Sequence, residues 1–387
     1  MKFMHSLTLT AFAGVLVSAG TADAKWPALK KEVSVIKAGR YLAPDGSIKK
    51  DALIRIKDGT ITGVGKSDES FDARLAVEYP DAVVSPGLID VDVKVGVDGY
   101  ATETIYAVDP DASTVESVDW NHDQLRQAVR AGITTVMVTP TPNNVVGGAA
   151  AVIKTSRAGS TSEVLRDGGP LMFALGSSTW SYDRSPTSRI GGLAILRDAL
   201  EQAAEGKAHP RLNQFASGKL DGMVVCEKAM DVSSALRLFH GAGQSIIVRY
   251  TGQEHDLSSE LSSMSRAFVT GPLTTDMQLR TMGMPGALAA KGVPVVFTSG
   301  IPDGPADGLR MSASLAARHG MDAKQARRAI TILPAIAAGV SDRVGSIYKG
   351  LDADFVVFSD DPLRLDARVL AVYVGGVCVY DASIQQE

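Results

Sequence analysis

The sequence predicts an α/β fold in which a (β/α)8 TIM-type barrel carries a small β-sandwich domain formed by the N- and C-terminal segments. Apolar strands alternate with amphipathic helices over residues 86–342, which is typical of βα units around a parallel sheet. The segments on either side contain short strands and turns only. We therefore expect a composite β-sandwich domain from residues 25–85 plus 343–387, and a barrel over residues 86–342, with an incomplete barrel as the alternative.

The first 24 residues have the pattern of a secretory signal peptide. Lys2 supplies a positive charge, residues 7–17 are mostly apolar, and Ala22-Asp23-Ala24 is a small-residue cleavage site. The apolar run is too short to span a bilayer comfortably. We expect cleavage near Ala24 and an exported, periplasmic mature chain without a transmembrane span. An uncleaved anchor is the alternative.

The terminal segments are predicted to form strands joined by tight turns. Residues 52–56 and 60–64 flank Asp58-Gly59, and an Asp-Gly pair between two β-rich runs predicts a hairpin. In the barrel region, strands are expected at residues 89–95, 133–138, 171–175, 222–226, 246–250, 267–270 and 293–298. A helix-rich stretch from Gly308 to Val340 ends this region, and strands return at residues 353–358, 369–374 and 377–380.

The charge balance excludes one class of partner. The formal net charge is −4, and the sequence has neither a basic patch nor an acidic tail. Proteins that bind nucleic acid carry clustered Lys and Arg. We therefore expect no nucleic-acid partner.

Five short motifs follow one another along the chain. They are the hairpin at residues 52–64, Ser85-Pro86-Gly87-Leu88-Ile89-Asp90, Gly132-Ile133-Thr134-Thr135-Val136, Thr331-Ile332-Leu333-Pro334-Ala335, and Gly345-Ser346-Ile347 with residues 349–355. In this order and spacing they resemble the amidohydrolase superfamily, in particular its imidazolonepropionase-like, exported group. The resemblance covers nearly the whole mature chain. It implies the barrel with a composite domain, and a hydrolase acting on C–N bonds other than peptide bonds.

The resemblance also implies a metal site of four histidines and an aspartate, and this sequence departs from it. The first-strand pair, His-x-His in the family, is Asp92 and Lys94 here. Val225 or Glu227 stands where the next histidine is expected, and Arg249-Tyr250-Thr251 contains no histidine. The expected aspartate is Gly300. An ammonium group has no lone pair for a metal, so we expect no metal cofactor.

The polar residues at the predicted strand ends are the candidate site. Ile89, Val91, Val93 and Val95 alternate with Asp90, Asp92 and Lys94, so we expect the apolar set to pack on helices and the polar set to face the barrel interior. Asp92 and Lys94 are the catalytic candidates. The ligand-pocket candidates come from later strand ends, where active sites of such barrels lie: Glu227, Arg249, Thr251, His255 and Asp303.

Two loops are further candidates for ligand contact. Residues 139–148 follow the second strand and are either a lid over the mouth or an ordinary long connection. Residues 180–189 carry Arg184 and Arg189, either of which could hold an anionic group or lie solvated.

Three interpretations of the altered strand remain open. The charges form a salt-bridge cluster in the space of the metal, they line a small-molecule pocket, or Lys94 and Asp92 perform metal-free chemistry as nucleophile and base. We favour a non-catalytic protein that binds a small ligand, or that partners an intact amidohydrolase paralogue or a second copy of itself. The alternative is an active hydrolase of non-peptide or peptide-like C–N bonds. It would use Asp92, Glu227 and Asp303 to hold manganese or magnesium.

Overall fold

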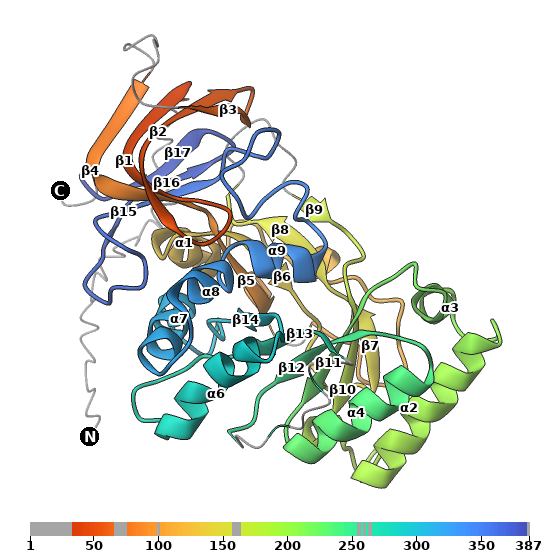
Figure 1. Ribbon diagram of the computed structural model, residues 1–387. Coiled ribbons are helices and arrows are strands. Elements are labelled where there is room, and N and C mark those ends of the chain that lie inside the picture. The colour runs from red at the N-terminus through yellow and green to blue at the C-terminus, as the bar shows by residue number, and fades with distance from the viewer. Residues whose placement is uncertain are drawn as a thin grey trace, which may run out of the picture.

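The computed structural model describes residues 33–65, 76–97, 99, 101–156, 164–253, 257, 261 and 265–384. The predicted signal peptide at residues 1–24 lies outside this range. Within it, the protein has a mixed α/β fold with a terminal sheet and a central region of strands and helices (Figure 1). Among the described residues, no helix is long and apolar enough to cross a membrane.

Both ends of the chain contribute to one seven-stranded sheet, in the order β17-β16-β15-β4-β1-β2-β3. Only β1 and β4 pair in parallel; the other neighbours are antiparallel. Its hydrogen bonds form a single sheet, whereas the sequence predicted a sandwich. The strands are β1 (Val35–Leu42), β2 (Ile48–Lys57), β3 (Thr60–Gly65), β4 (Ala76–Pro86), β15 (Phe355–Phe358), β16 (Val369–Val374) and β17 (Val377–Asp381).

The predicted hairpin between β2 and β3 is confirmed. Asp58 and Gly59 have φ angles of 50° and 72°. Two successive residues with positive φ form the type I′ turn that matches the twist of paired strands. Asp tolerates this backbone conformation and Gly adopts it freely, which explains the sequence of this turn.

The central region contains two sheets. A four-stranded sheet has the order β5-β6-β8-β9, and a six-stranded sheet has the order β14-β13-β12-β11-β10-β7. The strands are β5 (Leu88–Val93), β6 (Ile133–Val138), β7 (Val146–Ala149), β8 (Ala151–Lys154), β9 (Val164–Arg166), β10 (Leu171–Leu175), β11 (Gly222–Cys226), β12 (Ile246–Tyr250), β13 (Ser265–Thr270) and β14 (Val295–Phe297).

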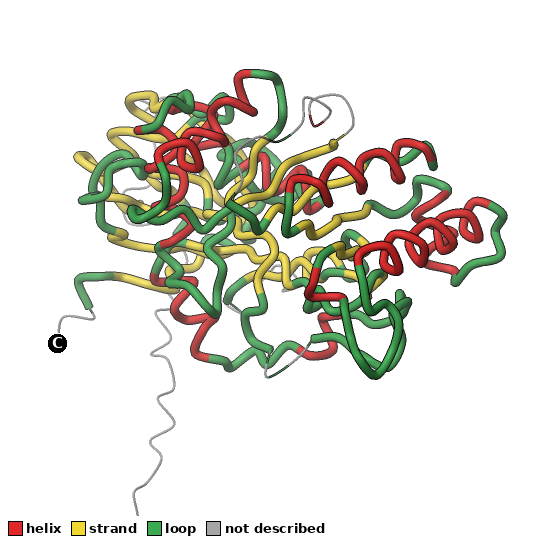
Figure 2. Tube along the Cα trace, turned by 90° about the horizontal axis from the view of Figure 1, so that it is seen from below, coloured by secondary structure: helices red, strands yellow, loops and turns green. Residues whose placement is uncertain are grey.

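Helices lie along the outside of these strands (Figure 2). Short 3-10 helices η2 (Thr114–Ser117) and η3 (Ser177–Thr179) follow β5 and β10. The α-helices are α1 (Asp123–Arg130), α2 (Arg189–Ala204), α3 (Pro210–Ala216), α4 (Ala229–Gly241), α6 (Leu279–Ala290), α7 (Gly308–Arg318), α8 (Ala323–Arg328) and α9 (Ile332–Ala338). The last three confirm the predicted helix-rich stretch.

The two sheets do not join into one closed ladder among the described residues. Strands β7 and β8 are separated only by Ala150, so one segment passes from the first sheet to the second. β7 pairs antiparallel with β10, and β8 pairs antiparallel with β6. The expectation of parallel pairing throughout is therefore wrong at this point. The interpretation of residues 139–148 as a lid is also wrong for residues 146–148, because they belong to the buried strand β7.

At β5 and β14, the other edge strands of the two sheets, hydrogen bonds outside the strand ladders link one sheet to the other. The amide of Lys94 donates to the carbonyl of Ile301 at 3.2 Å, just beyond the end of β14. The amide of Ser299 donates to both Asp90 carboxylate oxygens, each at 3.1 Å. Asp90 thus makes a side-chain link between β5 and the segment after β14.

An apolar cluster lies between the inner faces of the two sheets. It contains alternate residues of successive strands together with part of α9: Ile89, Val91, Met137, Val152, Met172, Ala174, Met223, Val225, Ile247, Ala267, Val269, Val296 and Ala335. A second, larger cluster packs the opposite strand faces against the helices. Ile89 and Val91 belong to the inner cluster, so the expectation that they face the outer helices is wrong, whereas Val93 and Val95 do lie in the outer cluster.

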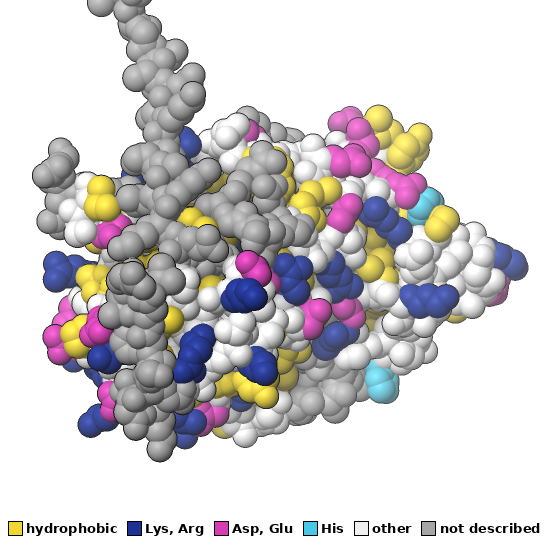
Figure 3. Space-filling view, turned by 90° about the horizontal axis from the view of Figure 1, so that it is seen from above, with side chains coloured by type: hydrophobic (Ala, Val, Ile, Leu, Met, Phe, Trp, Pro, Cys, Tyr) yellow, Lys and Arg dark blue, Asp and Glu magenta, His cyan; other side chains and the backbone are white. Residues whose placement is uncertain are grey.

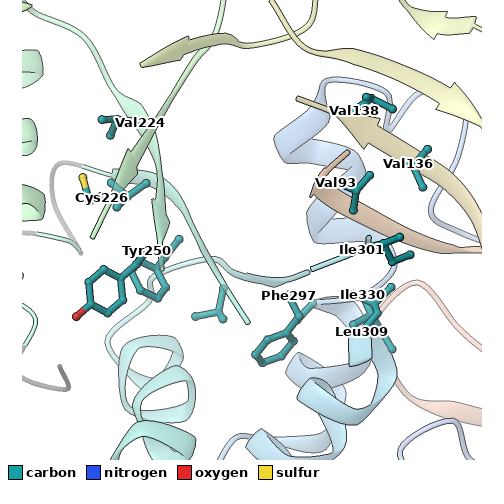
Figure 4. Close-up of a cluster of buried hydrophobic side chains, with 14 of the residues drawn as sticks. Val93, Val136, Val138, Val224, Cys226, Tyr250, Phe297, Ile301, Leu309 and Ile330 are labelled. Carbon is teal, nitrogen blue, oxygen red and sulfur yellow. The ribbon is translucent and has the colours of Figure 1, made fainter. Parts of the chain in front are cut away.

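A break in β5 explains this difference. Asp92 has a φ of 61°, and the pairing with β6 shifts register between Val91 and Val93. The break lets Val93 join Val136 and Val138 in the outer cluster (Figure 4). Strict alternation could not reveal a bulge, because one extra residue reverses which faces the following side chains occupy.

On the molecular face seen from above in Figure 3, acidic and basic side chains are interspersed. This distribution suits a net charge of −4 without strongly charged segments.

Candidate functional site

The site is centred on Asp92, whose two carboxylate oxygens both accept hydrogen bonds. Oδ1 accepts from Lys94 Nζ at 3.0 Å and from Thr139 Oγ1 at 2.8 Å. Oδ2 accepts from Arg249 Nε at 2.5 Å. The Lys94 ammonium also donates to Thr139 Oγ1 at 2.7 Å. The structure therefore joins three predicted site residues, Asp92, Lys94 and Arg249, in one ion-paired cluster.

Arg249 reaches Asp92 from β12 on the opposite sheet. Its register partners Val225 and Val269 belong to the inner cluster, so Arg249 also faces inward. Its Nη1 donates to the carbonyl of Tyr250 at 2.6 Å, and its Nη2 donates to the carbonyl of Gly271 at 3.0 Å. Only 7% of the side chain is exposed. A buried guanidinium with this many acceptors is fixed in position.

The pKa values of the two carboxyl groups of β5 are shifted in opposite directions. Burial would raise the pKa of Asp92, but Lys94 and Arg249 lower it to about 2. Burial raises the pKa of Asp90 to about 6, against hydrogen bonds from Ser299 and Thr298 that favour its charged form. Asp92 is therefore a stable anion at neutral pH, held between two cations.

Glu227 does not join this cluster. Its Oε2 accepts from the amide and hydroxyl of Ser177 at 2.9 and 2.7 Å, and its Oε1 accepts from the amide of Ser178 at 2.8 Å. Burial would raise its pKa, but these hydrogen bonds lower it. Glu227 thus fixes the start of η3 by accepting its free amides. Gly176 allows this approach, because a Cβ there would lie 2.5 Å from Glu227 Cδ.

The remaining predicted pocket residues lie apart. The amide of Thr251 donates to the carbonyl of Cys226 at 3.0 Å and links the ends of β11 and β12. Asp303 is exposed in the loop after β14. His255 lies outside the described residues.

Two contributors to the site were missed by the sequence reasoning. Thr139 directly follows β6 and bridges Lys94 and Asp92. Its position at a strand end, next to the strand that carries Asp92, was the available signal. The amide of Ser299 binds Asp90, and no sequence pattern indicates a contact made by a backbone amide.

The residues present do not fit the catalytic metal that the family resemblance implies. Within the described part of the chain, no group of three His, Cys, Asp or Glu residues is placed to hold a metal ion. Lys94 and Arg249 direct their N–H groups at the one central carboxylate, and neither cation can act as a ligand. A divalent ion beside Asp92 would also face two positive charges.

The mouth loops are held by arginines. Arg184 Nη2 donates to the carbonyl of Asn143 at 2.6 Å and to Asn144 Oδ1 at 2.9 Å, which joins the loops after β6 and β10. Arg189 Nε donates to Asp231 Oδ1 at 2.8 Å and thereby links α2 to α4. Arg189 therefore has a structural role. Arg184 joins the two loops and also lines a cavity of about 490 Å³.

Comparison with known proteins supports the family resemblance. The sequence profile of an amidohydrolase family matches residues 287–380. Amidohydrolase tasK of Hapsidospora irregularis is 25% identical over 193 residues, covering 48% of this chain and 18% of that protein. The match thus spans less than a fifth of the curated relative's length.

The fold is shared with solved structures over most of the chain. An amidohydrolase from Thermotoga maritima superposes with a TM-score of 0.78 and 24% identity, covering 90% of this chain and 99% of that one. A zinc-bound adenosine deaminase from Xanthomonas campestris gives 0.54 and 16%, covering 89% and 92%. E. coli guanine deaminase gives 0.52 and 14%, covering 90% and 100%. The C-terminal part of the chain is thus similar to an amidohydrolase family, and the fold is similar to that of solved amidohydrolases over most of the chain.

Proposed function

We propose that this protein is an exported amidohydrolase-fold protein that binds a small ligand at its barrel mouth and does not hydrolyse it. The observation that carries the proposal is the set of three hydrogen bonds that Lys94, Arg249 and Thr139 donate to the Asp92 carboxylate. Fixed side-chain cations occupy the place where the family resemblance implies a metal. A closed (β/α)8 barrel is part of the proposal, with β5 and β14 as adjacent strands.

The rival function is hydrolysis with a carboxylate-rich metal set. It requires Asp92, Glu227 and Asp303 to converge on one ion. Glu227 instead binds the amides of Ser177 and Ser178, and Asp303 is exposed in a loop. These positions favour the non-hydrolytic proposal.

Metal-free catalysis by Lys94 or Asp92 is also disfavoured. A lysine nucleophile needs a free lone pair, but the Lys94 ammonium is ion-paired at 3.0 Å with Asp92. A general base needs a pKa near the working pH, whereas the two cations lower the pKa of Asp92 to about 2.

A turnover assay tests this proposal. The mature protein is incubated with cyclic amides, N-acyl amino acids and dipeptides, with zinc, manganese or magnesium added, and then with a chelator. We expect no turnover above that of the Asp92→Ala variant. Turnover that the chelator abolishes, that Asp92→Ala removes and that Thr251→Ala retains would overturn the proposal.

Export has its own test. Residues 1–24 have the signal pattern described above. When the full chain is produced in a bacterium with two membranes, we expect it in the periplasmic fraction with an N-terminus directly after Ala24. Intact residues 1–24 on a protein in the cytosolic fraction would contradict export.

We also propose a partner-binding role, because apolar side chains are exposed at one end of three helices. Ile190, Met230 and Leu279 begin α2, α4 and α6 and are 80%, 54% and 70% exposed. Helices that return from parallel strands begin at the same edge of the sheet, so these residues lie on the mouth side. A second copy or an intact amidohydrolase relative would cover them.

Light scattering after size-exclusion chromatography tests this role. We expect an oligomer of the protein, alone or with its relative, that Ile190→Glu with Leu279→Glu dissociates and that Tyr348→Glu leaves intact. Equal masses for all variants would contradict it.

A further inference from the structure

A cavity of about 490 Å³ lies between the loops that follow β5, β6 and β10. Ile105, Asn143, Trp180, Asp183 and Arg184 contribute to its walls. Its described lining does not include Asp92 or Arg249, so it is separate from the ion-paired cluster. The volume falls within the range of about 300–1,000 Å³ that is usual for small-molecule sites.

The cavity wall is held in place by hydrogen bonds within and between its loops. Arg184 binds the carbonyl of Asn143 and the side chain of Asn144. The amide of Ser181 donates to the carbonyl of Pro186 at 3.0 Å, and the amide of Asp183 donates to Ser181 Oγ at 3.2 Å. A wall that is ordered before the ligand arrives loses less conformational entropy on binding.

The chemistry of the wall selects the kind of ligand. Trp180 offers a flat apolar surface, with 44% of the residue exposed. Asp183 and Arg184 carry opposite charges side by side, so the wall favours neither an anion nor a cation. Asn143 and Ser181 add neutral groups that both donate and accept hydrogen bonds.

We propose that this cavity binds a neutral saccharide, an inference that rests on the proposed ligand-binding function. A pyranose ring has a C–H face that packs on an aromatic ring, and a rim of hydroxyl groups that donate and accept. The Asp183 carboxylate can accept from two neighbouring hydroxyls, and the Arg184 guanidinium can donate to a third. Burial against Trp180 supplies apolar contact that water cannot replace.

Exposed aromatic side chains extend the surface beyond the cavity. Tyr182, two residues after Trp180, is fully exposed, and Tyr106 follows the lining residue Ile105 with 66% exposure. Exposed aromatic rings on neighbouring loops provide further stacking surfaces. The bound saccharide is therefore expected to contain more than one ring.

Isothermal titration calorimetry of the mature protein against glucose, galactose, N-acetylglucosamine, maltose and cellobiose tests the inference. We expect saturable binding of at least one sugar, with a disaccharide bound more tightly than its monosaccharide. Trp180→Ala and Asp183→Asn should each weaken binding about tenfold or more, because each removes a packing surface or a charged acceptor. Tyr348→Ala, an exposed aromatic remote from the cavity, should not.

The outcomes separate this inference from the proposed function. No saturable heat with any of these sugars at millimolar concentration would overturn the saccharide assignment. So would saturable binding of free amino acids that Asp183→Asn abolishes, because a zwitterion would then be the ligand. Neither result bears on hydrolysis, which the turnover assay with Asp92→Ala decides.

Discussion

Asp92 combines an unusual backbone conformation with a carboxylate that accepts three side-chain hydrogen bonds. Its φ of 61° lies in the left-handed region, where Asp and Asn are among the better-tolerated side chains. Such positions cost about 1–3 kcal/mol and persist where surrounding contacts determine them. Here Lys94, Thr139 and Arg249 provide those contacts. The bulge therefore directs the carboxylate to the cations.

The substitution Asp92→Asn tests the charge without changing the backbone preference. It leaves Lys94 and Arg249 facing each other without their anion, and loss of one partner of a buried ion pair costs about 3–5 kcal/mol. Because Lys94 is 24% exposed, we expect a loss near the lower limit.

Urea denaturation measures this loss, with Asp58→Asn as the control. Asp58 also has a positive φ, of 50°, but is exposed in the β2–β3 turn. The control substitution Asp58→Asn should change the free energy of unfolding by less than about 0.5 kcal/mol. Equal effects of the two substitutions would contradict the ion-paired cluster.

Asp90 and Asp92 should contribute to folding stability with opposite dependences on pH. Burial raises its pKa from 3.8 to about 6, so the folded protein binds a proton between these values that the unfolded chain has released. The stability from this group is therefore fully present below pH 3.8 and is lost as the pH rises through 6. The contribution is on the order of 3 kcal/mol. Asp92, with its lowered pKa, contributes stability that is lost only below pH 3.8.

Unfolding free energies at about pH 4 and pH 7 separate these contributions. We expect the difference between wild type and Asp90→Asn to change in this interval in favour of the wild type at the lower pH. A constant difference across the interval would show that Asp90 is ionised with an ordinary pKa.

Glu227 stabilises the loop after β10. It accepts the free amides at the start of η3, so Glu227→Ala leaves Ser177 and Ser178 without this acceptor. Replacing a cap costs about 1 kcal/mol. Asp303→Ala, at an exposed loop residue, should have no measurable effect on thermal unfolding. Loss of bound metal rather than stability in Glu227→Ala would instead support the carboxylate-metal alternative.

The strands differ in how far their sequence predicts their role. The turn at Asp58-Gly59 and the strands 133–138, 171–175, 222–226 and 246–250 follow from local pattern and are confirmed. The inward face of β5 does not, because the bulge at Asp92 reverses it. The strand β7 also escaped prediction, since Gly147 and Gly148 read as loop formers, while their burial against β10 is a tertiary effect.

A buried ion cluster joins the central region of the molecule to the C-terminal segment. Lys154 of β8 is 1% exposed and binds Asp352 at 2.8 Å and Asp354 at 3.0 Å. Arg343 binds Asp352 with two N–H groups, at 3.1 and 2.8 Å. The resemblance motif at residues 345–355 thus overlaps a structural contact whose lysine the sequence did not reveal.

Lys154→Met should destabilise the protein by about 3–5 kcal/mol, because it leaves two buried carboxylates without their shared cation. Lys37→Met is the matched control, since the Lys37–Glu78 pair is 37% and 51% exposed. An exposed pair contributes about 0–1 kcal/mol. Guanidinium denaturation that shows equal losses for both variants would contradict a stabilising role for the buried cluster.

The sequence could not show which of the predicted site residues lie together, because this depends on the whole fold. Asp92 and Lys94 were identified from one strand, but their link to Arg249 spans 157 positions of sequence and required β12 to face β5. Glu227 and Asp303 were equally plausible members of the cluster by sequence. In the structure, Glu227 instead binds the amide of Ser177, and Asp303 is exposed in a loop.

We propose that Lys94 and Arg249, which both donate to Asp92, occupy the place where the family resemblance implies a metal. The direct test is to measure the zinc content of the mature protein by inductively coupled plasma mass spectrometry. The protein is purified without chelators, incubated with excess zinc and then desalted. We expect well below one zinc ion per chain, both before and after incubation. Stoichiometric zinc that survives desalting and is lost in Asp92→Ala would contradict it.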